Sequence, residues 1–161
     1  MLLSSVGRKR ALEVVRHHRL IETFLYEVLD YPIEEVHEEA ERLEHFISER
    51  FEERIAAKLG HPKMDPHGHC IPTMYGAMPQ QDSIPLTDVM REGIYVVDSV
   101  SDHNARILRL LKESGIAPGV RLRVRERPSI ACCAVSIGRS SKLLNLQEDA
   151  ANSIRVCPLR K

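Results

Sequence analysis

The sequence has no excess of charge of either sign, because 23 Lys and Arg residues balance 23 Asp and Glu residues. This balance differs from the strong basic excess that usually marks a nucleic-acid-binding domain. No apolar run approaches the roughly 18 residues that would suggest a membrane span. The short apolar start MLLSSV also precedes its charges, whereas a signal peptide begins with them. We therefore expect a cytoplasmic protein that does not contact a membrane.

Motifs for catalysis and for thiol chemistry are missing as well. There is no nucleophile elbow, phosphate-binding loop or H-E-x-x-H sequence. The four cysteines, at positions 70, 132, 133 and 157, form no C-x-x-C pair, so we expect them to be reduced and to pack as small apolar residues. These absences predict that the protein is not an enzyme.

The first part of the chain is predicted to be helical. Apolar residues recur at helical spacing over residues 8–29, and the DYP sequence that follows ends this helix, because proline clashes with the preceding turn. A second helix is expected over 33–46. A third is expected from Ser48, a potential N-cap, to about Gly60, which can adopt the left-handed conformation of a helix end.

The pattern changes after the third helix. Residues 60–85 hold five prolines and three glycines without an apolar period, which predicts a linker. We therefore expect an α+β protein with a helical domain over 1–60, a linker over 61–83 and a small β-rich domain over 84–161.

Alternating apolar residues predict the strands of the β-rich domain. They recur over 94–100, 120–127 and 130–137, and again in the sequence SIRVCPL near the C-terminus. Between the first two strands, one short helix is expected to begin near Asp102 and to end at Gly115.

The stretch HEEAERLEH carries an unusual set of histidines and glutamates on one helix. Because a helix advances about 100° per residue, His37, Glu41, Glu44 and His45 fall on one face about 100° wide. This face borders the apolar face instead of lying opposite it. The apolar face comprises Val36, Ala40, Leu43 and Ile47. An unpaired carboxylate is costly near a core, and a divalent cation would stabilise such a cluster.

A matching pair lies on the first helix, where His18 and Glu22 are also four residues apart. Two helices joined by a tight turn would be antiparallel, which places this pair opposite His37 in one site. The candidate ligands over residues 41–45 would then form a second site about one turn away. Imidazole and carboxylate together suit Mn, Fe, Co, Ni or Zn, and the lack of a thiolate favours Mn(II) or Fe(II). The alternative is a charged helix surface, because this helix is acidic throughout.

Two further interpretations are weaker. The sequence His67-Gly-His69-Cys70 offers a third group of ligands, but Asp-Pro-His-Gly is typical of a turn, so no metal is expected there. The same histidines and glutamates could instead belong to a di-metal carboxylate oxidase built on a helical bundle. That enzyme class is disfavoured, because the Glu-x-x-His step is missing from the first helix and the second half is β-rich.

The segments GRKRALEVVRHHRLIETFLYEVL, EEVHEEAERLEHFISERFEERI and HPKMDPHGHCIP together resemble the diphtheria toxin repressor family of metal-dependent transcriptional regulators, including its manganese-responsive branch. The resemblance implies a helical dimerisation domain followed by an SH3-like, FeoA-type β-barrel. It also implies a homodimer, which agrees with the small core that a helical region of about 60 residues can form alone.

The resemblance further implies two metal sites. His18, Glu22 and His37 fall on the family's ancillary site, which a residue of the barrel completes; Asp102 is the best candidate here, ahead of Asp98 and Asn104. The primary, regulatory site of the family falls on Glu41, Glu44 and His45. Iron-responsive relatives have a cysteine at the first of these three positions, whereas the glutamate here resembles the manganese-responsive members.

In full-length members of this family, a winged helix-turn-helix domain precedes the dimerisation domain, and the resemblance implies that the given sequence begins where that domain ends. We therefore expect the metal-sensing and dimerising portion of a Mn(II)- or Fe(II)-dependent repressor. Operator DNA is expected to bind only if a winged helix domain is present in the native chain or in its partner. An alternative is a regulatory partner that forms mixed dimers with a full-length relative.

Overall fold

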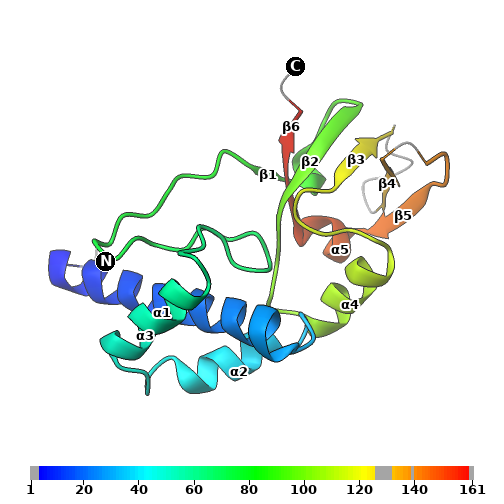
Figure 1. Ribbon diagram of the computed structural model, residues 1–161. Helices are drawn as coiled ribbons and strands as arrows, with labels where there is room; N and C mark the ends of the chain where they lie inside the picture. The colour runs from blue at the N-terminus through cyan, green and yellow to red at the C-terminus, as the bar shows by residue number, and fades with distance from the viewer. Residues whose placement is uncertain (1–3, 126–131, 139, 160–161) are drawn as a thin grey trace. The chain divides into compact units, whose positions relative to one another are not determined.

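The computed structural model describes residues 4–125, 132–138 and 140–159, and it divides into two compact units (Figure 1). The first unit spans Met1–Gln81 and the second spans Asp82–Lys161. The first is helical, and the second is a curled antiparallel sheet with short helices, so the predicted α+β class is confirmed. The domain limits expected from the sequence stay a prediction. None of the helices in the described ranges is both long and apolar enough to cross a membrane.

Three helices form the first unit: α1 (Ser5–Leu29), α2 (Val36–Leu43) and α3 (Glu49–Lys58). Helix α1 ends at Asp30, which adopts the left-handed conformation at φ 56° and donates its backbone N–H to the carbonyl of Leu25. Helix α3 begins as predicted, because the hydroxyl of Ser48 accepts a hydrogen bond from the backbone N–H of Phe51.

Helix α2 is shorter than the predicted helix over 33–46. Residues 33–35 and 44–46 form turns on either side of it. The N-cap position, Glu35, makes no capping bond with its side chain. At the other end, Ser48 must be extended to cap α3, with ψ at 155°, so the chain leaves the helical conformation before it. No glycine or proline marks this end in the sequence.

Helix α1 packs against each of the other two helices through a separate apolar cluster. The cluster with α2 contains Ile21, Leu25, Val36 and Ala40. The cluster with α3 contains Leu20, Ile55, Ala56 and Ile71. Burial of these side chains is the main source of stability for this unit, since α2 and α3 are too short to be stable alone.

The segment from Gly60 to Gln81 lies along α1, and two arginines of α1 donate hydrogen bonds to its backbone carbonyl groups. The guanidinium of Arg16 donates to the carbonyl of Pro72 at 2.7 Å, and that of Arg19 donates to the carbonyl of Cys70. Within the segment, residues 64 and 70 pair through an isolated bridge. These bonds hold a part of the chain that has no helix or ladder of its own.

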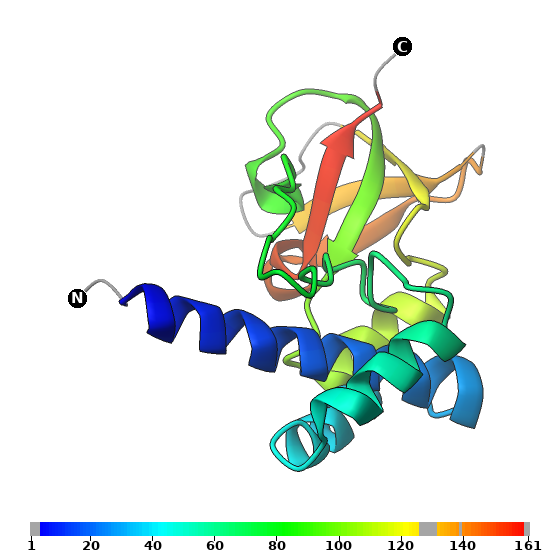
Figure 2. The ribbon, with the colours of Figure 1, turned by 60° about the vertical axis from the view of Figure 1, so that its left-hand side comes forward.

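The second unit is a six-stranded sheet in which all neighbouring strands are antiparallel, in the order β1-β6-β2-β3-β4-β5 (Figure 2). Its strands are β1 (Ile84–Pro85), β2 (Gly93–Val100), β3 (Arg121–Val124), β4 (Cys132–Ile137), β5 (Leu144–Gln147) and β6 (Ile154–Pro158). Its helices are the 3-10 helix η1 (Leu86–Asp88), α4 (Ala105–Glu113) and α5 (Glu148–Asn152). A separate core of apolar residues fills the curl of this sheet.

The sequence predicted β2, β3, β4, β6 and α4, although residues 126–127 and 130–131 of two predicted strands lie outside the described part. It missed β1, β5, η1 and α5. These elements have two to five residues each, so none is long enough to show a period in the sequence. Helix α4 also begins later than expected, because Asn104, not Asp102, is its N-cap.

Candidate metal centre

Helices α1 and α2 bring His18, Glu22 and His37 together. The first two lie one turn apart on α1, and His37 is in the first turn of α2, so the apolar packing of the two helices places all three at one point. Their candidate ligand atoms all lie within 4.8 Å of one another. Nε2 of His18 is 3.1 Å from Oε1 of Glu22 and 3.0 Å from Nδ1 of His37.

The centre is buried, and its carboxylate is the most buried part. The side chain of Glu22 is 0% exposed, and those of His18 and His37 are 14% and 20% exposed. Oε2 of Glu22 is also buried and accepts no hydrogen bond from any residue in the described ranges. A buried carboxylate oxygen without a donor is unfavourable unless a cation lies beside it.

The charges of His18 and Glu22 stabilise each other strongly. Burial lowers the pKa of His18, but hydrogen bonds and Coulomb attraction from Glu22, and then from Glu44, outweigh burial and raise this pKa to about 9. Burial raises the pKa of Glu22, but hydrogen bonds from His18 and His67 outweigh it and hold this pKa well below its ordinary value. Without a cation, the proton on His18 balances the buried carboxylate at neutral pH.

Of the three residues expected in a second site, Glu44 is largely buried, whereas Glu41 and His45 are exposed. Oε2 of Glu44 lies 2.7 Å from Nδ1 of His18, and its other oxygen lies 3.2 Å from Nε2 of His45. Glu44 therefore joins the two expected sites into one network. The side chains of Glu41 and His45 are 62% and 66% exposed. Their role as metal ligands stays a prediction.

Asp102, the expected ligand from the barrel, belongs to the second unit and precedes α4. Of the two alternatives, Asp98 lies in β2 and Asn104 is the N-cap of α4. The amide oxygen of Asn104 accepts hydrogen bonds from the backbone N–H groups of Arg106 and Ile107, so capping already uses it. Asp102 stays the predicted ligand, as expected from the resemblance.

The structure brings Asp65, His67 and His69 together at the stretch where the sequence had offered His67, His69 and Cys70 and no metal was expected. As predicted, the stretch is a turn, and Oδ1 of Asp65 accepts hydrogen bonds from the backbone N–H groups of both histidines at 2.9 Å. The three side chains meet within 4.8 Å. Nδ1 of His67 also lies 3.7 Å from Oε1 of Glu22, so this cluster adjoins the first. The signal in the sequence was an aspartate followed by histidines at the second and fourth positions after it.

The donor set at His18, Glu22 and His37 fits a divalent transition metal. Imidazole nitrogens and a carboxylate oxygen are ligands for Mn, Fe, Zn and related ions, and the described part of the cluster offers no thiolate. Oε2 of Glu22, which is buried and has no hydrogen-bond donor in the described ranges, is available to bind a cation.

Comparison with known proteins assigns each unit to a family. Residues 4–73 match the domain described as iron dependent repressor, metal binding and dimerisation domain, and residues 84–158 match the FeoA domain. The iron-dependent repressor IdeR of Mycobacterium tuberculosis is 31% identical over 166 residues, which cover 96% of this chain and 71% of IdeR.

Solved structures agree with this assignment. A manganese-dependent transcriptional repressor in complex with manganese is 39% identical, with a TM-score of 0.94 over 98% of this chain and 75% of that one. ScaR with bound Zn²⁺ is 32% identical, with a TM-score of 0.83 over 98% of this chain and 74% of that one. The chain therefore belongs to the family of metal-dependent transcriptional repressors that includes IdeR and diphtheria toxin repressor.

Proposed function

We propose that this chain is the metal-sensing and dimerising portion of a Mn(II)- or Fe(II)-dependent transcriptional repressor. The observation that carries the proposal is the buried Glu22 carboxylate, which has one oxygen without a donor beside two histidines. His18, Glu22 and His37 would hold one ion, and Asp102 would complete its shell. Glu41, Glu44 and His45 would hold a second.

The metal preference follows from the ligands of both sites. The six proposed ligands from the first unit all offer nitrogen or oxygen donors, and hard ions such as Mn(II) and Fe(II) prefer these over thiolates. The same donors also accept Zn(II), Co(II) or Ni(II), so availability in the cell would decide among them. We propose that the ion acts as a signal and not as a catalyst, because the relatives are repressors.

Regulation would follow from differential binding of the metal to two arrangements of the protein. An ion that gains ligands only in the DNA-competent arrangement shifts the population toward that arrangement. We propose that operator DNA is contacted by a winged helix domain in the native chain or in its partner. Transcription would then be repressed in the cytoplasm when the metal is abundant.

The proposed function can be tested with a chimera. The 161 residues would be fused to the DNA-binding domain of IdeR, and a gel shift with the IdeR operator would be measured with and without Mn(II). We expect a complex that requires Mn(II) and that is lost in a His18→Ala/His37→Ala chimera. A complex of equal strength without metal would contradict the proposal.

Mn(II) affinity is expected to rise with pH because His18 must release its proton before it can bind the ion. With the pKa of His18 at about 9, the apparent affinity should rise by up to about tenfold per pH unit between pH 7 and 8.5. Calorimetric titrations across this range would measure it. A His18→Gln variant should bind Mn(II) weakly, and its affinity should depend less on pH. An affinity of the unchanged chain that does not depend on pH would show that His18 releases no proton on binding.

Homodimerisation is expected to involve the exposed apolar residues around the end of α2 and the start of α3. Phe46 is 86% exposed, and Leu43 and Phe51 are 37% and 51% exposed. A Phe46→Asp substitution should raise the dimer dissociation constant by at least about tenfold, because it places a charge where the dimer would bury an aromatic side chain. Light scattering over a dilution series would measure this. Tyr75→Asp, at the same 86% exposure, is the matched control and should leave the dimer intact.

A further inference from the structure

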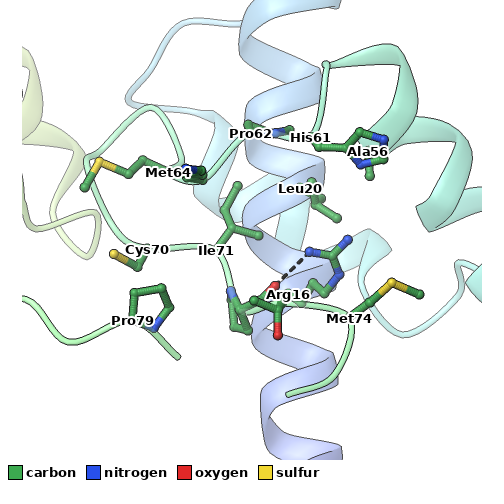
Figure 3. A pocket seen from close by; sticks show the side chains of 13 residues that line it. Arg16, Leu20, Ala56, His61, Pro62, Met64, Cys70, Ile71, Met74 and Pro79 are labelled. Carbon is green, nitrogen blue, oxygen red and sulfur yellow. Dashed lines mark hydrogen bonds between the residues drawn. The ribbon is translucent and has the colours of Figure 1, made fainter. Parts of the chain in front are cut away.

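A cavity of about 690 Å³ lies in the first unit between α1, the end of α3 and the segment from His61 to Pro79 (Figure 3). Arg16 and Leu20 face this cavity from α1. Because a helix turns about 100° per residue, they lie about 160° around the helix axis from His18 and Glu22. The cavity is therefore separate from the metal centre.

The walls of this cavity are largely apolar. Leu20, Ala56 and Ile71 form its floor and are at most 4% exposed, because they also pack in the apolar cluster between α1 and α3. Met64 and Met74, which also line the cavity, are 45% and 64% exposed. Figure 3 shows Leu20 and Ile71 beside each other, with Pro79 and Met74 at the sides. Cavities of about 300–1,000 Å³ with apolar walls are the usual size for small-molecule sites.

The charged groups that line the cavity all have the same sign. The cations are Arg16 and Lys63, and the described lining residues include no carboxylate. Arg16 is fixed in place, because its guanidinium donates to Glu52 at 2.6 Å and to the carbonyl of Pro72 at 2.7 Å. Glu52 offsets that charge, whereas Lys63 is exposed and forms no ion pair within the described ranges. Lys63 is thus the cation left to attract an anion.

We propose that this cavity binds a small amphipathic carboxylate, with its apolar chain or ring against Leu20, Ala56 and Ile71 and its anionic head at Lys63. The apolar walls exclude a purely polar metabolite, which would lose its hydration without new partners. Among the described residues that line the cavity, Lys63 is the cation without an ion pair, which favours one negative charge on the ligand. This site is independent of the metal, so its failure would leave the proposed repressor function untouched.

The test is a fluorescence titration of the 161-residue chain with a dansyl-labelled undecanoic acid. We expect saturable binding of one probe per chain, displaced by unlabelled decanoate. The methyl ester of the probe should bind about tenfold more weakly, and Lys63→Glu should weaken binding of the acid by about tenfold. Lys58→Glu, the same charge change at an exposed position of α3 outside the cavity, is the matched control and should change binding less than about twofold.

A second variant tests the apolar walls. Ala56→Phe fills the cavity and should abolish probe binding while Mn(II) binding and the helical circular dichroism signal are kept. The proposal would be overturned if the acid and the ester bound equally well. It would also be overturned if the unchanged chain, Lys63→Glu and Ala56→Phe all bound the acid equally well. Binding that disappears as the chain dimerises would also overturn it, because a second copy would then occupy the cavity.

Discussion

Replacing His18 and His37 together by alanine is expected to weaken Mn(II) binding by at least about a hundredfold. The loss of partners that merely orient metal ligands already costs about 10–100-fold, and this change removes two nitrogen ligands outright. Of the three proposed ligands on α1 and α2, Glu22 alone would remain. Calorimetric titration of both proteins at pH 7.5 measures the effect.

The control for this change should remove an imidazole elsewhere in the first unit. His61 is suitable, because it is exposed and lies outside the candidate centre. Its φ is 57°, and asparagine tolerates this left-handed conformation better than alanine does. His61→Asn should therefore bind Mn(II) like the unchanged chain. Equal affinity in the double alanine variant would show that the HEEAERLEH face is only a charged surface.

Replacing Glu22 by glutamine is expected to destabilise the metal-free protein by about 3 kcal/mol at pH 7, because it removes the larger of the two counter-charges of buried, protonated His18 and leaves only Glu44. Burial lowers the pKa of His18, but its interactions with Glu22, and to a smaller extent with Glu44, raise this pKa to about 9. The stability that this pair supplies is present below the ordinary pKa of histidine and is lost as pH rises through about 9. Urea unfolding with circular dichroism detection measures the free energy.

Two comparisons make the Glu22 experiment specific. Glu27→Gln, an exposed position on the same helix, should change the free energy of unfolding by no more than about 0.5 kcal/mol. At pH 10, where His18 is neutral in both proteins, the destabilisation by Glu22→Gln should be clearly smaller than at pH 7. A loss that is the same at both pH values would show that the buried charge pair is not its cause.

The sequence was informative where ligands sit on regular helices. The spacing of four between His18 and Glu22, and the border position of His37 on its helix, predicted that these three would meet, and they do. The role of Glu44 was not predictable in detail. It depends on how the chain turns after Leu43, and the contact with His18 at 2.7 Å follows from that turn.

Features that depend on the segment after α3 were harder to predict. Asp65, His67 and His69 come together through hydrogen bonds from backbone groups to an aspartate, which leave no periodic pattern in a sequence. The apolar cavity depends on how far that segment lies from α1. That distance is set by the bonds that Arg16 and Arg19 make to carbonyl groups, and nothing in the residue types fixes it.

The most direct measurement is an anomalous difference map from crystals of the chain grown with Mn(II), recorded near the manganese absorption edge. The account predicts a peak within bonding distance of the imidazoles of His18 and His37 and of the Glu22 carboxylate. No peak in the first unit, or a peak at Asp65, His67 and His69 alone, would contradict the assignment of the metal centre.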